Sequence, residues 1–194
     1  MNLNVEKILI IGLGMIGSSI ALASKSKGIK VYGFDKSNNS IKEALEKNII
    51  DSKVESILDI NSKDFVKKVD LIIVAVPPKQ TLDVLNDLKD IWNTDVTITD
   101  TSSVKNHIKL NGASNIVLSH PIAGSDQSGI SAANGDLFKN KKNVLCDPFN
   151  SKKGHFEKVD NFWKNALQMR TSSMSVSEHD LIFAMTSHLP HLVS

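Results

Sequence analysis

Lys7-Ile8-Leu9-Ile10-Ile11-Gly12-Leu13-Gly14-Met15-Ile16-Gly17-Ser18-Ser19-Ile20-Ala21-Leu22-Ala23 is the stretch that decides the fold. After Lys7 it has four consecutive aliphatic residues, a run typical of a strand that is buried on both faces. The run stops at Gly12, and apolar residues return after Gly17 with helical spacing. The sequence therefore predicts a strand, a tight turn at Gly12 and a helix that Gly17 allows to pack closely against the strand.

The spacing of the three glycines is typical of a dinucleotide site when it joins a strand to a helix. Gly14 has no Cβ to keep a pyrophosphate from the backbone, and the helix N-terminus points free N–H groups at the phosphates. A second predicted strand, 30–34, ends at Asp35, whose carboxylate can accept hydrogen bonds from both hydroxyls of an adenosine ribose. Its charge would repel a 2′-phosphate, so NAD is expected rather than NADP. The alternative is that Asp35 only caps the next helix.

Cofactor contacts are expected at this turn, at Asp35 and at the ends of two later strands. The predicted contacts are Gly12, Gly14, Met15, Ile16, Gly17, Asp35, Val76, Pro77 and Asp100.

Composition narrows the class of protein. The chain has 194 residues, of which 41% are hydrophobic and 23% charged, as expected of a globular protein with a sizeable core. A net charge of +2 argues against nucleic acid or an anionic membrane as a partner. Cys146 is the only cysteine, no run approaches the ~20 apolar residues of a membrane span, and the N-terminus lacks a signal-peptide pattern. We therefore expect a cytoplasmic protein without disulfides.

Strand and helix patterns alternate along the chain. Apolar runs at 69–76, 96–99, 115–118 and 143–146 predict central strands, and 168–171 predicts an edge strand. After the first of these runs, a predicted helix carries Leu82, Leu85, Leu88 and Trp92 on one face. Residues 48–62 carry no clear pattern. The alternation predicts an α/β protein with a Rossmann-type, doubly wound and mostly parallel sheet.

The last predicted helix opens at Ser175 or Ser177 and is still apolar at Ser194, without a stop signal. We therefore expect a dinucleotide-binding domain at 1–172, and at 173–194 the first helix of a C-terminal all-helical domain.

His120 is the leading candidate for chemistry, because it ends a predicted strand and is held by Pro121. An imidazole, with an ordinary pKa of about 6.5, can take the proton of an alcohol while hydride leaves the carbon. Ser103 can hydrogen-bond the same alcohol. The alternative is a histidine bonded only to loop carbonyls. His188 and His191 share a helical face, where they can line the pocket or pack in a core, and no carboxylate or cysteine joins them locally, so no metal is expected.

Four segments together resemble the prephenate dehydrogenase family, including its arogenate and cyclohexadienyl members. They are Gly12-Leu13-Gly14-Met15-Ile16-Gly17-Ser18-Ser19, Asp100-Thr101-Ser102-Ser103-Val104-Lys105, His120-Pro121-Ile122-Ala123-Gly124-Ser125-Asp126-Gln127-Ser128-Gly129 and Ser187-His188-Leu189-Pro190-His191.

The resemblance implies NAD-dependent oxidative decarboxylation of prephenate or arogenate, which yields 4-hydroxyphenylpyruvate or tyrosine in tyrosine biosynthesis. His120 would be the general base, Ser103 would assist it, and substrate contacts would come from His188, His191, Ser125 and Asp126. A dicarboxylate substrate calls for an arginine, but Arg170 is the only one and is poorly placed. The family's arginine is expected in the helical dimerisation domain that follows, so we expect a homodimer through that domain and little turnover by this chain alone.

Two other functions stay open on sequence grounds. One is a dehydrogenase of the β-hydroxyacid type, which would use a catalytic lysine on a later helix. The other is a non-catalytic NAD-binding or regulatory module, in which His120 could be replaced without consequence.

Overall fold

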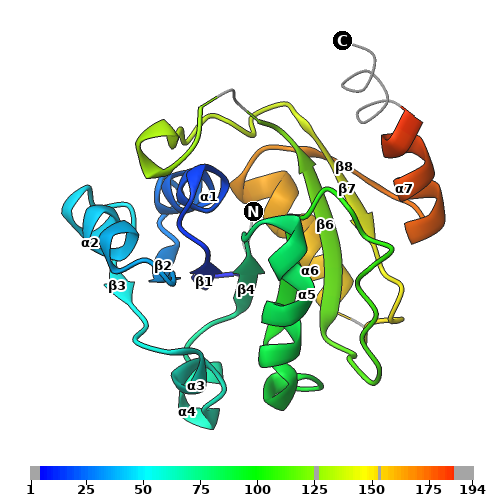
Figure 1. Ribbon diagram of the computed structural model, residues 1–194, viewed down its shortest axis with the longest axis horizontal. Coiled ribbons are helices and arrows are strands. Elements are labelled where there is room, and N and C mark those ends of the chain that lie inside the picture. Colours follow the sequence, from blue (N-terminus) through cyan, green and yellow to red (C-terminus); the bar gives the residue numbers. More distant parts are fainter. Residues whose placement is uncertain (1–4, 125–126, 153, 186–194) are drawn as a thin grey trace.

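The computed structural model describes residues 5–124, 127–152 and 154–185, and its centre is an eight-stranded sheet of order β3-β2-β1-β4-β5-β6-β7-β8 (Figure 1). The strands are β1 (Lys7–Ile11), β2 (Lys30–Phe34), β3 (Ser52–Lys53), β4 (Leu71–Val74), β5 (Thr97–Asp100), β6 (Ile116–Ile122), β7 (Lys142–Cys146) and β8 (Arg170–Ser173). The helices are α1 (Met15–Lys25), α2 (Asn38–Glu46), α3 (Ile57–Ile60), α4 (Lys63–Val66), α5 (Pro78–Asp87), α6 (His155–Asn161) and α7 (Val176–Phe183). Shorter turns are η1 (Lys89–Ile91), η2 (Ile130–Ala132) and the π-helical turn η3 (Phe162–Ala166).

The sheet is mostly parallel, as the sequence predicts. Strands β1 to β6 pair in parallel, whereas β7 pairs antiparallel with β6, and β8 is parallel to β7. Only Ile98 and Thr99 of β5 pair with β6, so the second half of β6 continues past β5 and is paired by β7 alone. That extension carries His120 beyond the central strands.

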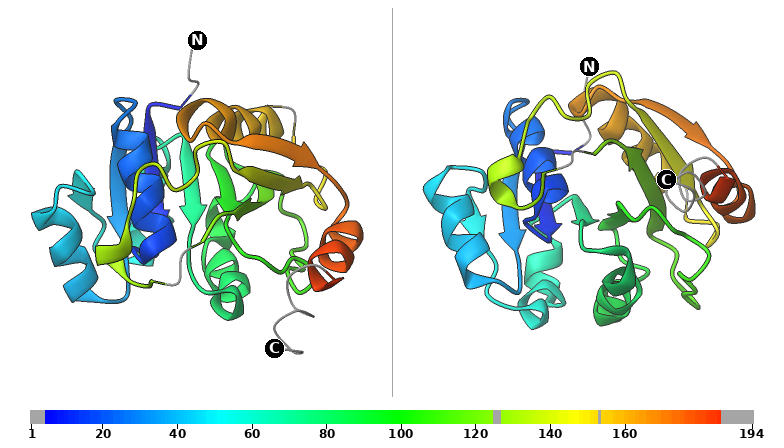
Figure 2. Two further views of the ribbon diagram at one scale, coloured as in Figure 1. Left: turned by 90° about the horizontal axis from the view of Figure 1, so that it is seen from above. Right: turned by 45° about the horizontal axis from the view of Figure 1, so that its top comes forward.

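Helices flank the sheet on both faces (Figure 2). Every residue of the central strand β1 after Lys7 is therefore buried. Ile8 and Ile10 pack on the face covered by α1 and α6, together with Trp163. Leu9 and Ile11 belong to the core on the opposite face, under α5. This double burial is the reason that β1 reads as an uninterrupted aliphatic run.

Several boundaries differ from the predicted ones. The helix after Pro77 ends at Asp87 rather than continuing through Trp92, because Leu88 leaves helical geometry (φ −90°, ψ 11°) and η1 follows. Trp92 still packs against the same apolar core as Leu85 and Leu88. The unassigned stretch 48–62 contains β3 and α3, whose brevity explains the missing pattern.

At the C-terminal side, β8 continues to Ser173, two residues beyond the predicted strand. Ser175 then caps α7, since its hydroxyl accepts a hydrogen bond from the Glu178 amide at 3.2 Å. In the described part of the chain, which ends at residue 185, α7 is the only helix after β8. The second, all-helical domain and the division after residue 172 therefore stay predictions. None of the described helices has the length and apolar character needed to cross a membrane.

Candidate active site

The glycine turn is packed so tightly that two of its positions admit no side chain. Gly12 has a φ of +98°, and a Cβ built there would lie 2.5 Å from the Ala75 carbonyl oxygen. A Cβ at Gly17 would lie 1.9 Å from the Gly12 carbonyl oxygen. Gly14 differs, because a Cβ there meets nothing within 4 Å. Gly12 and Gly17 therefore hold the turn together, whereas Gly14 leaves space where a ligand can approach the backbone.

Asp35 fastens this turn to the end of β2. Its Oδ2 accepts a hydrogen bond from the Leu13 amide at 2.7 Å, and its Oδ1 accepts one from the Ser37 amide at 2.8 Å. The cap of α2 is Ser37, whose hydroxyl accepts from the Ser40 amide at 3.2 Å, so Asp35 is not a simple helix cap. Each carboxylate oxygen has lone pairs left for a further donor.

Two adjoining cavities run along the carboxyl edge of the parallel strands. The first cavity, of about 290 Å³, is lined by Asp35, Phe34 and Gln80 among others, and the second cavity, of about 380 Å³, is lined by Met15, Ser103 and His120 among others. Both are lined by Gly14, Ala75, Val76 and Pro77, so they meet where β4 ends. A larger cavity of about 640 Å³ lies at the opposite edge of the sheet, among Asp70, Asp95 and Lys158, and none of the predicted site residues lines it.

The residues present fit a dinucleotide. The empty Cβ direction of Gly14 and the N-terminal turn of α1 lie where the two cavities meet, which suits a pyrophosphate. Asp35 lies on the first cavity, where an adenosine ribose would be held, and His120 lies on the second.

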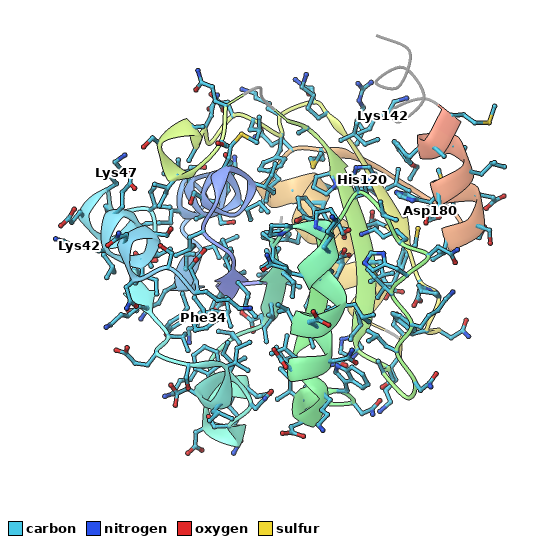
Figure 3. All side chains as sticks on the ribbon, viewed as in Figure 1. Phe34, Lys42, Lys47, His120, Lys142 and Asp180 are labelled. Atoms are coloured by element: carbon cyan, nitrogen blue, oxygen red, sulfur yellow. The ribbon has the colours of Figure 1, made fainter. Side chains whose placement is uncertain are left out.

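His120 is connected to two residues of α7. Its Nδ1 lies 2.9 Å from Nε2 of His179, and Nδ1 of His179 lies 2.7 Å from Oδ1 of Asp180. Figure 3 labels both ends of this chain of contacts, His120 on β6 and Asp180 on α7. His179 is fully buried, and the ring of Phe183 packs 4.6 Å, centroid to centroid, from each imidazole. Burial lowers the pKa of His179, although the hydrogen bond with Asp180 opposes that shift.

The loop after β5 holds Asp180 in place. Asp180 accepts hydrogen bonds from the Lys105 amide at 3.0 Å and the Asn106 amide at 2.7 Å. Burial would raise the pKa of Asp180, but its bonds with His179 and these two amides outweigh burial and lower the pKa. The carboxylate is therefore an acceptor at neutral pH.

Asp100 is not at the surface of either cavity. Its buried carboxylate accepts from Nζ of Lys105 at 2.6 Å and from the amides of Ser102 and Ser119, both at 3.0 Å. Lys105 Nζ also donates to the Ser119 carbonyl at 2.6 Å. Burial lowers the pKa of Lys105, and the Asp100 carboxylate opposes that shift. Asp100, which the sequence places among the cofactor contacts, thus braces the loop and β6 with its side chain instead of facing the cavities.

The other predicted positions fall into two groups. Val76 and Pro77 line both cavities, Met15 and Ile16 line the second, and Gly17 lies behind the turn. Ser125, Asp126, His188 and His191 lie outside the described residues, so their roles stay predictions. His179, Asp180 and Lys105 are not among the site residues that the sequence predicts. The signal was an acid next to a histidine at a helix start, which is also what an ordinary first helical turn looks like.

Comparison with known proteins now adds to this geometry. Residues 20–168 match the family described as "Prephenate dehydrogenase, nucleotide-binding domain". The chain belongs to the prephenate dehydrogenase family. Over 203 aligned residues it is 34% identical to the prephenate dehydrogenase of Bacillus subtilis (strain 168), with 100% of this chain and 53% of that protein covered. It is 32% identical to the cyclohexadienyl dehydrogenase of Zymomonas mobilis, with 97% of this chain and 65% of that protein covered.

Solved structures of a prephenate dehydrogenase and of an arogenate dehydrogenase agree with this assignment. The crystal structure of the enzyme from A. aeolicus in complex with hydroxyphenyl propionate and NAD+ superposes with a TM-score of 0.88 at 30% identity, covering 100% of this chain and 68% of that one. Synechocystis arogenate dehydrogenase gives a TM-score of 0.83 at 25% identity, covering 95% of this chain and 65% of that one. This member of the prephenate dehydrogenase family spans about half the length of its Bacillus subtilis relative, 53%.

Proposed function

We propose that this chain is the dinucleotide-binding and proton-accepting part of an enzyme that oxidatively decarboxylates prephenate, arogenate or both, with NAD. The products would be 4-hydroxyphenylpyruvate and tyrosine, respectively, and the reaction would serve tyrosine biosynthesis in the cytoplasm. One observation carries the proposal: His120 and Ser103 line the same cavity, which adjoins the glycine turn and Asp35. The relative that was crystallised with NAD+ and hydroxyphenyl propionate supports it.

The family resemblance implies the chemistry that we propose, and the positions of these residues support it. Bound NAD supplies the hydride acceptor for the ring carbon that carries the substrate hydroxyl. His120 takes the hydroxyl proton at Nε2, and the Ser103 hydroxyl hydrogen-bonds the same oxygen. The bond to the ring carboxylate then breaks, carbon dioxide leaves, and the electron pair enters the ring, which becomes aromatic. The phenol oxygen takes the proton back from His120, so the imidazole ends the cycle neutral.

The remaining contacts are proposed from the family resemblance. Ser125, Asp126, His188 and His191 would shape the substrate pocket, and residues 173–194 would begin a helical domain through which two copies pair. The ring carboxylate of the substrate needs a cation. Arg170 is engaged elsewhere, because its Nη2 donates a hydrogen bond to the Asn140 carbonyl oxygen at 3.0 Å. We therefore expect this chain to bind NAD but to turn over slowly by itself.

Calorimetry with NAD and NADP, followed by single-turnover formation of NADH from prephenate and from arogenate, tests the proposal. His120→Asn should leave NAD affinity unchanged and slow NADH formation on the order of 10²–10⁴-fold, which is the rate enhancement that a general base usually contributes. Asp83→Asn, an exposed change on α5, is the control and should alter neither quantity. An unchanged rate in His120→Asn would favour the non-catalytic module, and no heat on titration with NAD would overturn the proposal altogether.

A further inference from the structure

Three side chains, Asp180, His179 and His120, form a chain of hydrogen bonds whose direction can be derived. Asp180 is held as a carboxylate that already accepts two backbone amides, so it can only accept from His179. The proton between Asp180 and His179 must therefore be on Nδ1 of His179, whose distance to Oδ1 is 2.7 Å.

This first assignment fixes the next one. A neutral imidazole carries one proton, so Nε2 of His179 is an acceptor when Nδ1 carries the proton. Nε2 of His179 faces Nδ1 of His120 at 2.9 Å, and Nδ1 of His120 must therefore be the donor. Its other nitrogen, Nε2, is left without a proton, which is the form that can accept one.

We propose that His179 and Asp180 are positioning residues that hold His120 in the Nδ1–H tautomer and thereby keep its Nε2 ready to accept a proton. The inference rests on the proposed function only where it makes Nε2 of His120 the acceptor of the substrate proton. The tautomer itself follows from the contacts between the three side chains.

The surroundings of His179 suit this role and disfavour storage of a proton on His179 itself. His179 is fully buried, with Phe183 against its ring and the Lys105 ammonium among the charges that lower its pKa. Asp180 and Asp100 act in the other direction. Burial therefore disfavours an extra proton on His179 itself.

A purely structural alternative is that these contacts only dock α7 against the loop that follows β5. Docking requires the amides of Lys105 and Asn106 to bond Asp180, but it does not require a particular proton position on either imidazole. The tautomer of His120 is therefore the readout that separates the two explanations.

Asp180→Asn is the most informative variant. The Asn oxygen can replace Oδ2, which accepts the Asn106 amide at 2.7 Å and the Lys105 amide at 3.3 Å. The Asn amide group then replaces Oδ1, where the Lys105 amide loses its second acceptor, and donates to Nδ1 of His179. His179 must then carry its proton on Nε2 and donate to Nδ1 of His120. The direction of the whole chain of bonds is reversed, and His120 becomes the Nε2–H tautomer, which cannot act as a base.

The experiment is ¹⁵N NMR of the histidine rings in the 194-residue chain at pH 8, with His120 assigned from the signals lost in His120→Asn. We expect a protonated Nδ1 on His120 in the unaltered chain and a protonated Nε2 in Asp180→Asn. Glu178→Gln removes the same charge two residues earlier on α7 and keeps an acceptor for the Ser175 amide, so it should leave the tautomer unchanged. Should His120 carry its proton on Nε2 already in the unaltered chain, or keep Nδ1–H in a folded Asp180→Asn, the proposal would be overturned.

His179→Leu provides a second test if Asp180→Asn folds poorly. It removes the acceptor for Nδ1 of His120, so the Nε2–H form should appear, whereas an unchanged Nδ1–H form would count against the proposal. In the rate assay, Asp180→Asn should slow NADH formation on the order of 10²-fold with unchanged NAD affinity. A reversed tautomer with an unchanged rate would support the positioning role and contradict the base role of His120, so the two proposals fail separately.

Discussion

The ammonium of Lys105 and the carboxylate of Asp100 form an ion pair from which solvent is excluded, with Nζ 2.6 Å from Oδ2 and both side chains 0% exposed. Because the pair also bonds the amide and the carbonyl of Ser119, it joins the end of β5 to the residue before His120. Two charges out of water are tolerated only when every polar group between them is paired.

Breaking this pair should be costly, whereas replacing both members should cost less. Lys105→Met leaves the Asp100 carboxylate buried without its cation, so we expect a loss of about 3–5 kcal/mol in the free energy of unfolding. Adding Asp100→Asn removes the uncompensated charge and keeps an acceptor for the Ser119 amide, so the double variant should be more stable than Lys105→Met. Urea unfolding of the two single variants and the double variant measures the coupling, and strictly additive losses would show that the two groups act independently.

Two glycines of the turn should respond in opposite ways to alanine. Gly17→Ala places a Cβ 1.9 Å from the Gly12 carbonyl oxygen, so the turn must move and the melting temperature should fall. Gly14→Ala meets no atom within 4 Å and has an ordinary φ of −70°, so its melting temperature should be unchanged or slightly higher.

The same Gly14→Ala change fills the place where we expect the pyrophosphate. It should therefore weaken NAD binding by at least about tenfold, or ~1.4 kcal/mol, in calorimetry. Full NAD affinity in Gly14→Ala would mean that the dinucleotide does not cross the turn at this glycine.

Asp35 should decide between NAD and NADP. Asp35→Asn keeps an oxygen for the Leu13 amide but removes the charge that would repel a 2′-phosphate, and Lys36 follows it on the wall of the first cavity. We expect the ratio of the NADP to the NAD dissociation constant to fall at least about tenfold. A ratio that stays the same, measured beside the Asp83→Asn control, would mean that the adenosine ribose is held elsewhere.

His155 should make stability depend on pH. Its Nδ1 lies 2.7 Å from the Thr97 hydroxyl oxygen, and burial lowers its pKa, helped by the nearby Lys158. Because the unfolded chain binds this proton more readily, the stabilisation is complete above pH about 6.5 and is lost as the pH falls from there toward the lowered native pKa.

His155→Gln should therefore flatten the fall in the free energy of unfolding between pH about 6.5 and 5, measured by denaturant titration at each pH. Some slope should remain, since the pKa of His179 is lowered in the same direction. A curve parallel to that of the unaltered chain would show that His155 takes up its proton equally in both states.

The fold was largely predictable because buried strands leave a strong signal. The aliphatic runs that became β1 and β4, and the glycines between β1 and α1, each admit few other structures. The antiparallel direction of β7 left no such signal, because the residue pattern of Lys142–Cys146 is the same for a parallel and for an antiparallel strand. The end of α5 was also missed, since Leu88 continues the apolar spacing even though its backbone leaves the helix.

Only the site residues that belong to local sequence motifs were predictable. Motif spacing pointed to Asp35 and His120, each of which ends or lies near the end of a strand. His179 was not foreseeable in this way, because its role depends on the extension of β6 past β5, which brings α7 beside His120. Asp100 was assigned to the cofactor because strand ends usually face it, but the buried Lys105 turned its carboxylate inward.

The separation of His120 and His179 by 59 positions has a consequence for how the protein is made. The described residues that line the two cavities all precede residue 130, so a ribosome synthesises them before α7. Until α7 emerges and folds back, nothing from this helix dictates which nitrogen of His120 carries the proton. On the tautomer assignment proposed above, the proton position on this histidine is thus set only after every described strand of the sheet has been made.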